Sequence, residues 1–533
     1  MHHARNIAAV LIAGLAAVLP LAGPSAAQKS GGILRTYNST NPPSASILEE
    51  ATIAVAFSFS GVFNNLLVFD QSKPHNGLDT IVPELAESWT WDASRTKLTV
   101  KLRGGVKWHD GKPFTARDVQ CTWDKLKGKH ADAFRSNPRA VWWTNLAEVT
   151  ISGDLEATFV LARPQASFPA LLASSLSPVY PCHVPAKDMR RSPIGTGPYK
   201  LVSFESNRSI KLARNPDYWK PGRPYLDGVD ITIIGNRSTR MLAFIANEFD
   251  LTFVADITVP LIGEVKAQAP KAICPLVPTG VSTNLMVNRN KPPFDDARLR
   301  KAMALALDRQ AMIDILSSGK SSIAGAMMPL PEGGWGMPKE MTMALPGYGG
   351  TQAERQAEAR RIMEGLGYGP GKRLKVKVST RDFQSFKDPA VLLVDQLNRI
   401  YFDAELEIIE SAVWYGRITR QDYAVALNLT GSGVDDPDVT LLEGYACNSD
   451  RNYTKYCDPE VDKLLADQSA EADIARRKEI VWRIERVLAE DVARPIITHS
   501  SAATCWHPRL KDFVLHENSI YNNWRLEHVW LDK

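Results

Sequence analysis

The chain has 533 residues, of which 44% are hydrophobic and 23% charged, and its formal net charge at pH 7 is +4. This length exceeds what one compact core supports, so the sequence predicts two or three globular domains. The charges are nearly balanced and scattered. They form no basic stripe interleaved with aromatic residues, which argues against a nucleic acid as partner.

The first 27 residues have the composition of a secretory signal peptide. Arg5 gives a positive start, residues 8–22 are apolar, and small residues lead to a predicted cleavage site before Gln28. The apolar segment is too short to span a bilayer comfortably, and the sequence offers no other candidate span. The mature chain, from residue 28, is therefore expected to be a soluble exported protein.

Residues 98–126 combine a predicted strand, a tight turn and a capped helix. Apolar residues alternate from Leu98 to Leu102, as in a strand with one buried face. Thr115 fits a helix N-cap, and Asp118 three positions later completes a capping box. None of these residues indicates catalysis, so the segment is predicted to be scaffold.

Two regions alternate strands and helices as parallel α/β sheets do. The first predicts a strand, a helix and a strand at 229–234, 238–247 and 250–254. The second predicts strands at 374–379, 405–410 and 423–429, with a helix opened by Asp388-Pro389 and a short helix near Trp414.

Two further helices are predicted between these regions. Asp295 or Asp296 caps the first, Asp308 caps the second, and Gly319 ends it. The pattern as a whole predicts two separate α/β lobes.

The loops of the second lobe predict a binding crevice. Ligands of open parallel sheets bind at the carboxyl ends of strands, where loops and helix N-termini converge. Arg381, Trp414 and the loop 430–438 all follow strands of this lobe. Arginine provides a fork for a carboxylate or phosphate, tryptophan an apolar face, and a glycine-rich loop close backbone approach.

Other chemistries find little support in the sequence. No phosphate-loop motif, G-x-S-x-G or H-E-x-x-H is present, which disfavours an enzyme. His109 stands beside a predicted hairpin turn and is interpreted as structural or exposed. His499 and His507 could bind a metal or haem, although no third ligand is evident.

Six cysteines lie in a chain expected to be exported, where disulfides can form. Only Cys447 and Cys457 are close in sequence, and they are predicted to form a disulfide; spacing leaves the other pairings open. A zinc site is disfavoured because neither C-x-x-C nor a nearby histidine pair occurs.

Four long stretches resemble the solute-binding proteins of family 5, the periplasmic peptide, dipeptide and nickel binders of ABC importers. The stretches follow one another at 78–119, 194–234, 292–309 and 359–368, and the likeness runs from about Gly31 to the C-terminus. The resemblance implies an α/β, periplasmic binding protein-like fold of the cluster C type, with three domains arranged as two lobes around a hinge.

The resemblance also implies where the domains begin and end. The hinge would lie near 272–278 and 494–498, because a few residues suffice to absorb the change in dihedral angles on closure. The expected divisions are 28–67, 190–274 and 495–533 for the first lobe, 68–189 for an inserted domain, and 275–494 for the second lobe.

Some expected site residues are carried over from the family. Arg381 matches a position that meets a ligand carboxylate in dipeptide binders, and Trp414 matches a pocket wall. Another cleft edge and the glycine-rich loop complete the expected set: Asn38, Ser39, Thr40, Ser432, Gly433, Asp435 and Asp436.

Gly433 departs from the family pattern. Peptide binders carry there an Asp that receives the ligand's amino group, and a buried ammonium without a carboxylate costs several kcal/mol. Asp435 or Asp436 could substitute. An acidic or amide-bearing molecule, an opine-like compound or a sugar is therefore considered beside a peptide.

The resemblance implies a monomeric periplasmic receptor that closes over a small or peptide-like solute and delivers it to an ABC permease in the inner membrane. It implies no catalysis, cofactor, metal or nucleic-acid partner. Alternatives are a haem or nickel carrier of the same family and a periplasmic enzyme on a similar scaffold.

Overall fold

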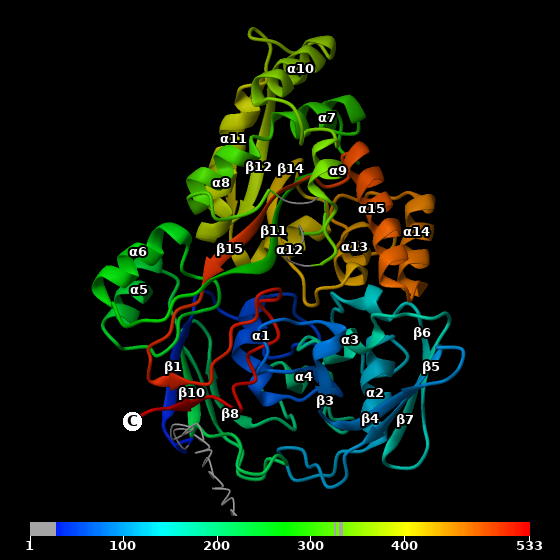
Figure 1. Cartoon of the computed structure of the whole chain (residues 1–533), viewed down its shortest axis with the longest axis vertical. Helices are drawn as coiled ribbons and strands as arrows, with labels where there is room; N and C mark the ends of the chain where they lie inside the picture. Colours follow the sequence, from blue (N-terminus) through cyan, green and yellow to red (C-terminus); the bar gives the residue numbers. More distant parts are fainter. Residues whose placement is uncertain (1–27, 324–326, 330–333) are drawn as a thin grey trace, which may run out of the picture.

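The computed structural model describes residues 28–323, 327–329 and 334–533, so the predicted signal peptide lies outside the described residues. Two lobes stand one above the other, and β11 (Leu276–Val287) and β15 (Ile496–Ala503) run from one to the other (Figure 1). Within the described ranges, no helix combines the length and the apolar character that crossing a membrane requires.

A four-stranded sheet forms the base of the first lobe. Its order is β1-β10-β9-β8, and β1 pairs with β10 in parallel. The strands are β1 (Ile33–Asn38), β8 (Tyr199–Glu205), β9 (Ser209–Arg214) and β10 (Gly228–Ile233), and α5 (Arg237–Ile245) follows β10.

The strand predicted at 250–254 is reduced to single bridges. Leu251 bridges Thr36 and Trp506, but no ladder continues from it. The backbone N–H of Arg35 donates to the carboxylate of Asp250 at 2.8 Å. This N–H is therefore not available for a β-ladder between residues 250–254 and β1.

An antiparallel sheet of order β4-β5-β7-β6 lies beside the first lobe (Figure 1). It comprises β4 (Ala86–Trp91), β5 (Lys97–Leu102), β6 (Leu146–Ile151) and β7 (Glu156–Leu161). The predicted capped helix is α2 (Ala116–Leu126), and the Asp118 carboxylate accepts the N–H of Thr115 at 3.0 Å. Trp123 of α2 packs edge-on against Phe159 of β7 and fixes the helix on the sheet.

The second lobe holds a five-stranded sheet of order β13-β12-β14-β11-β15. The strands β12 (Leu374–Arg381), β13 (Phe402–Ile409) and β14 (Val425–Gly431) run parallel to one another. The strand β11 is antiparallel to both of its neighbours, β14 and β15. Because these three strands run in the same direction, their carboxyl ends, at Arg381, Ile409 and Gly431, lie at one edge of the sheet.

The helices of the second lobe agree with their predicted caps, with one exception. Asp296 caps α7 (Ala297–Ala306) and Asp308 caps α8 (Arg309–Ser317), each through its side chain. However, α11 (Gln384–Asn398) begins a turn before Asp388. Phe383 is extended, and its carbonyl accepts the N–H groups of residues 386 and 387, which starts the helix early and leaves Pro389 inside it.

The remaining elements complete the two lobes. The helices are α1 (Ile53–Phe59), α3 (Phe168–Ala173), α4 (Ala186–Met189), α6 (Val259–Gln268), α9 (Lys339–Met343), α10 (Gln352–Gly365), α12 (Ser411–Thr419), α13 (Pro437–Tyr445), α14 (Pro459–Ala470) and α15 (Ile474–Glu490). Short strand pairs are β2 (Leu67–Phe69) with β3 (Ile81–Pro83), and β16 (Leu510–Lys511) with β17 (Trp530–Leu531).

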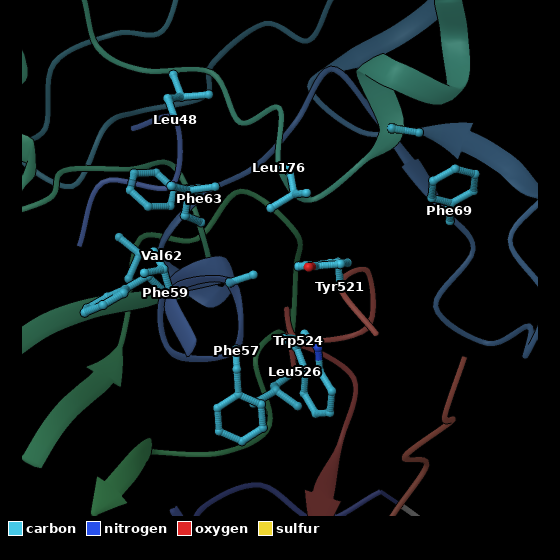
Figure 2. Packing of buried hydrophobic residues seen from close by; sticks show 14 of the residues in the cluster. Leu48, Phe57, Phe59, Val62, Phe63, Phe69, Leu176, Tyr521, Trp524 and Leu526 are labelled. Carbon is cyan, nitrogen blue, oxygen red and sulfur yellow. The ribbon is translucent and has the colours of Figure 1, made fainter. Parts of the chain in front are cut away.

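Each lobe has its own hydrophobic core. In the first lobe, aromatic residues of α1 pack against the C-terminal segment, with the rings of Phe57 and Trp524 4.7 Å apart (Figure 2). A separate cluster around Leu285, Val378 and Leu427 fills the second lobe. Most of each lobe therefore packs within itself, although Val434 and Val439 of the second lobe join the core of the first lobe.

The two crossing strands form the connection between the lobes. They pair from Leu276 opposite Ala503 to Asn284 opposite Ile496, with a register shift between Pro278 and Ser282. This pairing places β15 in the sheet of the second lobe. The domain boundary expected at residue 495 would assign the residues of β15 to the first lobe. A disulfide between Cys274 and Cys505 joins the strands where they enter the first lobe.

Candidate functional site

A cavity of about 670 Å³ lies between the lobes. Residues of the first lobe, the crossing strands and the second lobe all contribute to its walls. Its lining includes 51–54 and 253–256 from the first lobe, Thr279, Val281 and Thr283 from β11, and Phe386, Val391 and Leu392 from the second lobe. A movement of one lobe relative to the other would therefore change the cavity.

Arg381 lies in the wall, at the end of β12, as its position in the sequence predicts. Its Nε donates to Ser411 Oγ at 2.8 Å, and its guanidinium lies 5.6 Å from the ring centre of Phe386. Its side chain is 9% exposed, and no carboxylate forms an ion pair with it among the described residues. The rest of its guanidinium can therefore bind a ligand.

Arg237 faces the same cavity from the other lobe. It is the first residue of α5, directly after its N-cap Asn236. Within the described chain its side chain has no hydrogen bond or ion pair, and its Nε is buried without a partner. Each lobe thus contributes to the cavity one arginine whose guanidinium forms no ion pair among the described residues.

The two carboxylates in the cavity wall differ in their partners. Asp256 is buried and paired with Arg240 at 2.6 Å and 2.7 Å, and it also accepts from Tyr37 at 2.9 Å. Among the described residues, Asp388 of α11 accepts only from the amide of Gln384. The charges that remain available to a ligand are therefore two positive and one negative.

Much of the cavity wall is apolar. It includes Leu261 of α6, Leu316 of α8 and Phe386 of α11. Ile315 and Val391, also in the lining, are 60% and 54% exposed, so the apolar surface of the cavity is open to solvent. A ligand with an apolar body would cover this surface.

The loop after β1 contributes two of its three expected residues. Ser39 and Thr40 line the cavity. Asn38 does not, because its amide donates to Ala54 O and Ser58 Oγ, both at 3.0 Å, and so joins β1 to α1. Its role in this structure is to hold the loop.

Trp414 lies away from the cavity. It is fully buried and packs with Met286, Ile409 and Tyr423 in the core of the second lobe. Tyr415 lines the cavity instead. Adjacent residues of a helix point about 100° apart, so only one of the two can face the ligand.

Gly433 is closed off by neighbouring side chains. A Cβ at this position would lie 2.8 Å from Leu176 Cδ1 and 3.3 Å from the ring of Trp142. Its carbonyl accepts from Asn522 Nδ2 at 2.9 Å. The space in which an Asp would receive a ligand amine is filled by protein.

Asp436 does not substitute for the missing carboxylate, because it caps α13 and pairs with Arg477 at 2.6 Å and 2.9 Å. Ser432 and Asp435 line a second cavity, of about 610 Å³. Burial raises the pKa of Asp435 to about 7, and Asn518 donates to its carboxylate at 3.0 Å.

The histidines considered as ligands have separate surroundings. His109 Nδ1 accepts the N–H of Gly195 at 3.2 Å, its Nε2 donates to Gly197 O at 3.0 Å, and burial lowers its pKa to about 4. His499 lines the second cavity, and burial lowers its pKa to about 4 as well. His507 stacks on Phe244 and contacts its carbonyl at 2.9 Å.

The cysteines of the described chain are paired. Cys447 is joined to Cys457, as expected, and Cys121 to Cys182. In the described residues, the one group with metal-ligand spacing is Cys121, His130 and Cys182, and its two sulfur atoms are bonded to each other.

Arg237, Tyr415 and Tyr521 also line the cavity, although the sequence patterns did not lead to them. Arg237 follows β10, which is parallel to β1, so the strand-end rule used for the second lobe would have found it. Tyr521 belongs to an irregular C-terminal segment, where no periodic pattern indicates which side chains face inward.

Comparisons with known proteins identify relatives along most of the chain. The model of the bacterial extracellular solute-binding proteins, family 5, matches residues 80–452. The chain is 24% identical over 517 residues to the probable di/tripeptide-binding protein 5 of Pseudomonas aeruginosa, covering 91% of this chain and 93% of that protein.

Two solved structures have a similar fold. OppA of Haemophilus influenzae, in complex with the peptide RPPGFSPFR, superposes with a TM-score of 0.82 at 20% identity, over 95% of this chain and 99% of that one. The binding protein AgaA of A. tumefaciens R10, in complex with agropinic acid, does so with a TM-score of 0.82 at 19% identity, over 94% and 99%.

Proposed function

Because the chain belongs to the bacterial extracellular solute-binding proteins of family 5, we propose that it is the periplasmic receptor of an ABC importer. It captures a small organic solute between its lobes and delivers the solute to a permease of the inner membrane. The observation that carries this proposal is the cavity whose walls come from both lobes and the crossing strands. It acts as a monomer, and binding rather than bond-making is its task.

The relatives leave the class of solute open. Curated relatives are named as di/tripeptide and oligopeptide binders, and structural neighbours of similar TM-score hold a peptide or agropinic acid. The closed position at Gly433 favours a solute other than an ordinary peptide, because no carboxylate stands there to receive an amino terminus.

Ligand binding by the purified mature chain tests the proposal. A ligand that binds only the folded state raises the melting temperature, and lobe closure lowers the radius of gyration in X-ray scattering. We expect both changes with one class in a library of peptides, organic acids, opines and sugars, and recovery of the ligand intact by mass spectrometry. Flat melting curves across the library would contradict the proposal, and chemical turnover would favour an enzyme.

A further inference from the structure

We propose that the solute is an amphipathic dianion, an apolar body with two carboxylates, held by Arg381 on one lobe and Arg237 on the other. This inference rests on the proposed function and names the class of ligand. It begins from the charges of the cavity wall, which do not balance within the protein.

Four charged side chains occur among the described residues that line the cavity: Arg237, Asp256, Arg381 and Asp388. Asp256 is neutralised by Arg240 behind it. Two guanidiniums and the half-buried Asp388 then remain, so the empty cavity has a net positive charge. A buried or half-buried cation is costly without an anion, which an anionic ligand supplies.

The positions of the arginines determine how the anion is held. Arg381 ends a strand of the second lobe and Arg237 begins a helix of the first. Among the described residues, Asp388 forms no ion pair with either arginine and accepts only from Gln384, so a monoanion that engages one arginine leaves the other unpaired in the closed cavity. A ligand with two carboxylates pairs both, and its contact with both lobes favours the closed arrangement.

The surface between the arginines determines the body of the ligand. Phe386, Leu392, Leu261 and Leu316 contribute aromatic and aliphatic area, and Ile315 and Val391 are exposed at the same cavity. A sugar, which is polar over most of its surface, would leave this apolar area without an apolar partner. A hydrocarbon or aromatic body buries it.

The test uses linear dicarboxylates from succinate to sebacate, arene dicarboxylates, and the monomethyl ester of each, measured by calorimetry on the purified mature chain. We expect at least one diacid to bind, and to bind about 30-fold more tightly than its monoester, since one charged interaction is lost. In Arg237→Gln and in Arg381→Gln this ratio falls to about two, the statistical advantage of two equivalent carboxylates, because each variant retains a single guanidinium.

Arg208→Gln serves as the matched control, because Arg208 is exposed and pairs with Glu205 outside the cavity. It should keep the full ratio, and Arg381→Lys, which retains the charge, should keep part of it. Monoesters or neutral peptides binding as well as diacids, or a ratio unchanged in either glutamine variant, would overturn the dianion assignment while leaving the receptor function intact. Failure of every diacid, peptide, sugar and opine to bind would overturn both.

Discussion

At the scale of single residues, Gly433 decides both the charge and the space at one position of the loop after β14. Gly433 carries no carboxylate, and Leu176 and Trp142 occupy the volume that a carboxylate would need. The position therefore offers a ligand amine neither a charge nor space.

Replacing Gly433 with Asp should therefore destabilise the fold without creating a peptide site. We expect Gly433→Asp to lower the free energy of unfolding by about 2–4 kcal/mol, since it adds a clash with Leu176 Cδ1 and a buried charge. Urea unfolding measures the effect. Gly433→Ala, which adds the clash alone, should cost less, and adding Leu176→Ala to the Asp variant should recover part of the loss. A stable variant that binds dipeptides would contradict this view.

Asp435 provides a second test at this scale, through pH. Burial raises its pKa to about 7 from an ordinary value near 3.8, and the nearby Asp436 acts in the same direction. Between these pH values the folded chain holds a proton that the unfolded chain has lost. The contribution of Asp435 to stability is therefore largest near pH 4, falls as the pH rises to about 7, and is constant above.

Asp435→Asn removes this dependence, and its amide oxygen can still accept from Asn518. The variant should equal the wild type in unfolding free energy near pH 4 and exceed it by about 2–4 kcal/mol at pH 8. The difference between the two proteins is the quantity to measure, because buried His109, His499 and His516 have lowered pKa values and act with the opposite sign in the wild type. A difference independent of pH would exclude the protonation of Asp435.

At the scale of elements, the sequence predicts what depends on local pattern. The caps at Asp296 and Asp308 and the capping box at Thr115 are confirmed, because each is decided by a few neighbouring residues. The start of α11 is predicted wrongly, since Asp388-Pro389 has the composition of a helix start but Phe383 already provides one. Local composition offers two starts here, and the chain uses the earlier one.

The side chains of the site are harder to predict than the elements that carry them. Arg381 follows from its place at a strand end. Trp414 and Tyr415 cannot be told apart by sequence, because either face of a short helix can be the buried one. Tyr521 reaches the cavity from a segment without a periodic pattern, about 280 residues beyond Arg237, and only the tertiary fold brings it to the wall.

The register shift in the crossing strands is the element-scale feature that can be tested. Gly280 lies within it at a φ of +64°, and a Cβ there would lie 2.6 Å from the carbonyl oxygen of Asn518. Gly280→Ala should lower the free energy of unfolding by about 2–3 kcal/mol, from the left-handed backbone and the clash together.

Gly128→Ala is the matched control for Gly280→Ala. Gly128 has a φ of +67°, and a Cβ there would meet nothing within 4 Å, so the alanine adds only the cost of the backbone conformation, about 1 kcal/mol. Melting temperatures of the two variants give the comparison. Equal losses would mean that the approach of Asn518 is unimportant.

At the scale of the whole molecule, hydrogen bonds join the two sides of the molecule beside the cavity. These bonds form when the lobes close. In the second lobe, Asp438 accepts from Ser167 Oγ at 2.5 Å and from Gln165 Nε2 at 3.2 Å. Glu443 accepts from Trp142 Nε1 at 2.7 Å. The donors lie between α2 and α3, in the part of the chain that carries the antiparallel sheet β4-β5-β7-β6, so an opening movement about the crossing strands would separate donors from acceptors on this side.

These contacts should set the affinity for the solute, because a ligand that binds the closed form is weakened by whatever makes closure less favourable. The double variant Ser167→Ala, Trp142→Phe removes two of these hydrogen-bond donors. The phenyl ring keeps part of the apolar volume of the indole. Each of these hydrogen bonds contributes about 1 kcal/mol or more, so their loss should weaken ligand binding about 10- to 30-fold. The radius of gyration of the unliganded protein, measured by X-ray scattering, should increase. The control Ser94→Ala lies in an exposed turn and should change neither quantity. Unchanged affinity and size in the double variant would mean that the antiparallel sheet of β4 to β7 and the second lobe move as one body. The hinge would then have to lie elsewhere than in β11 and β15.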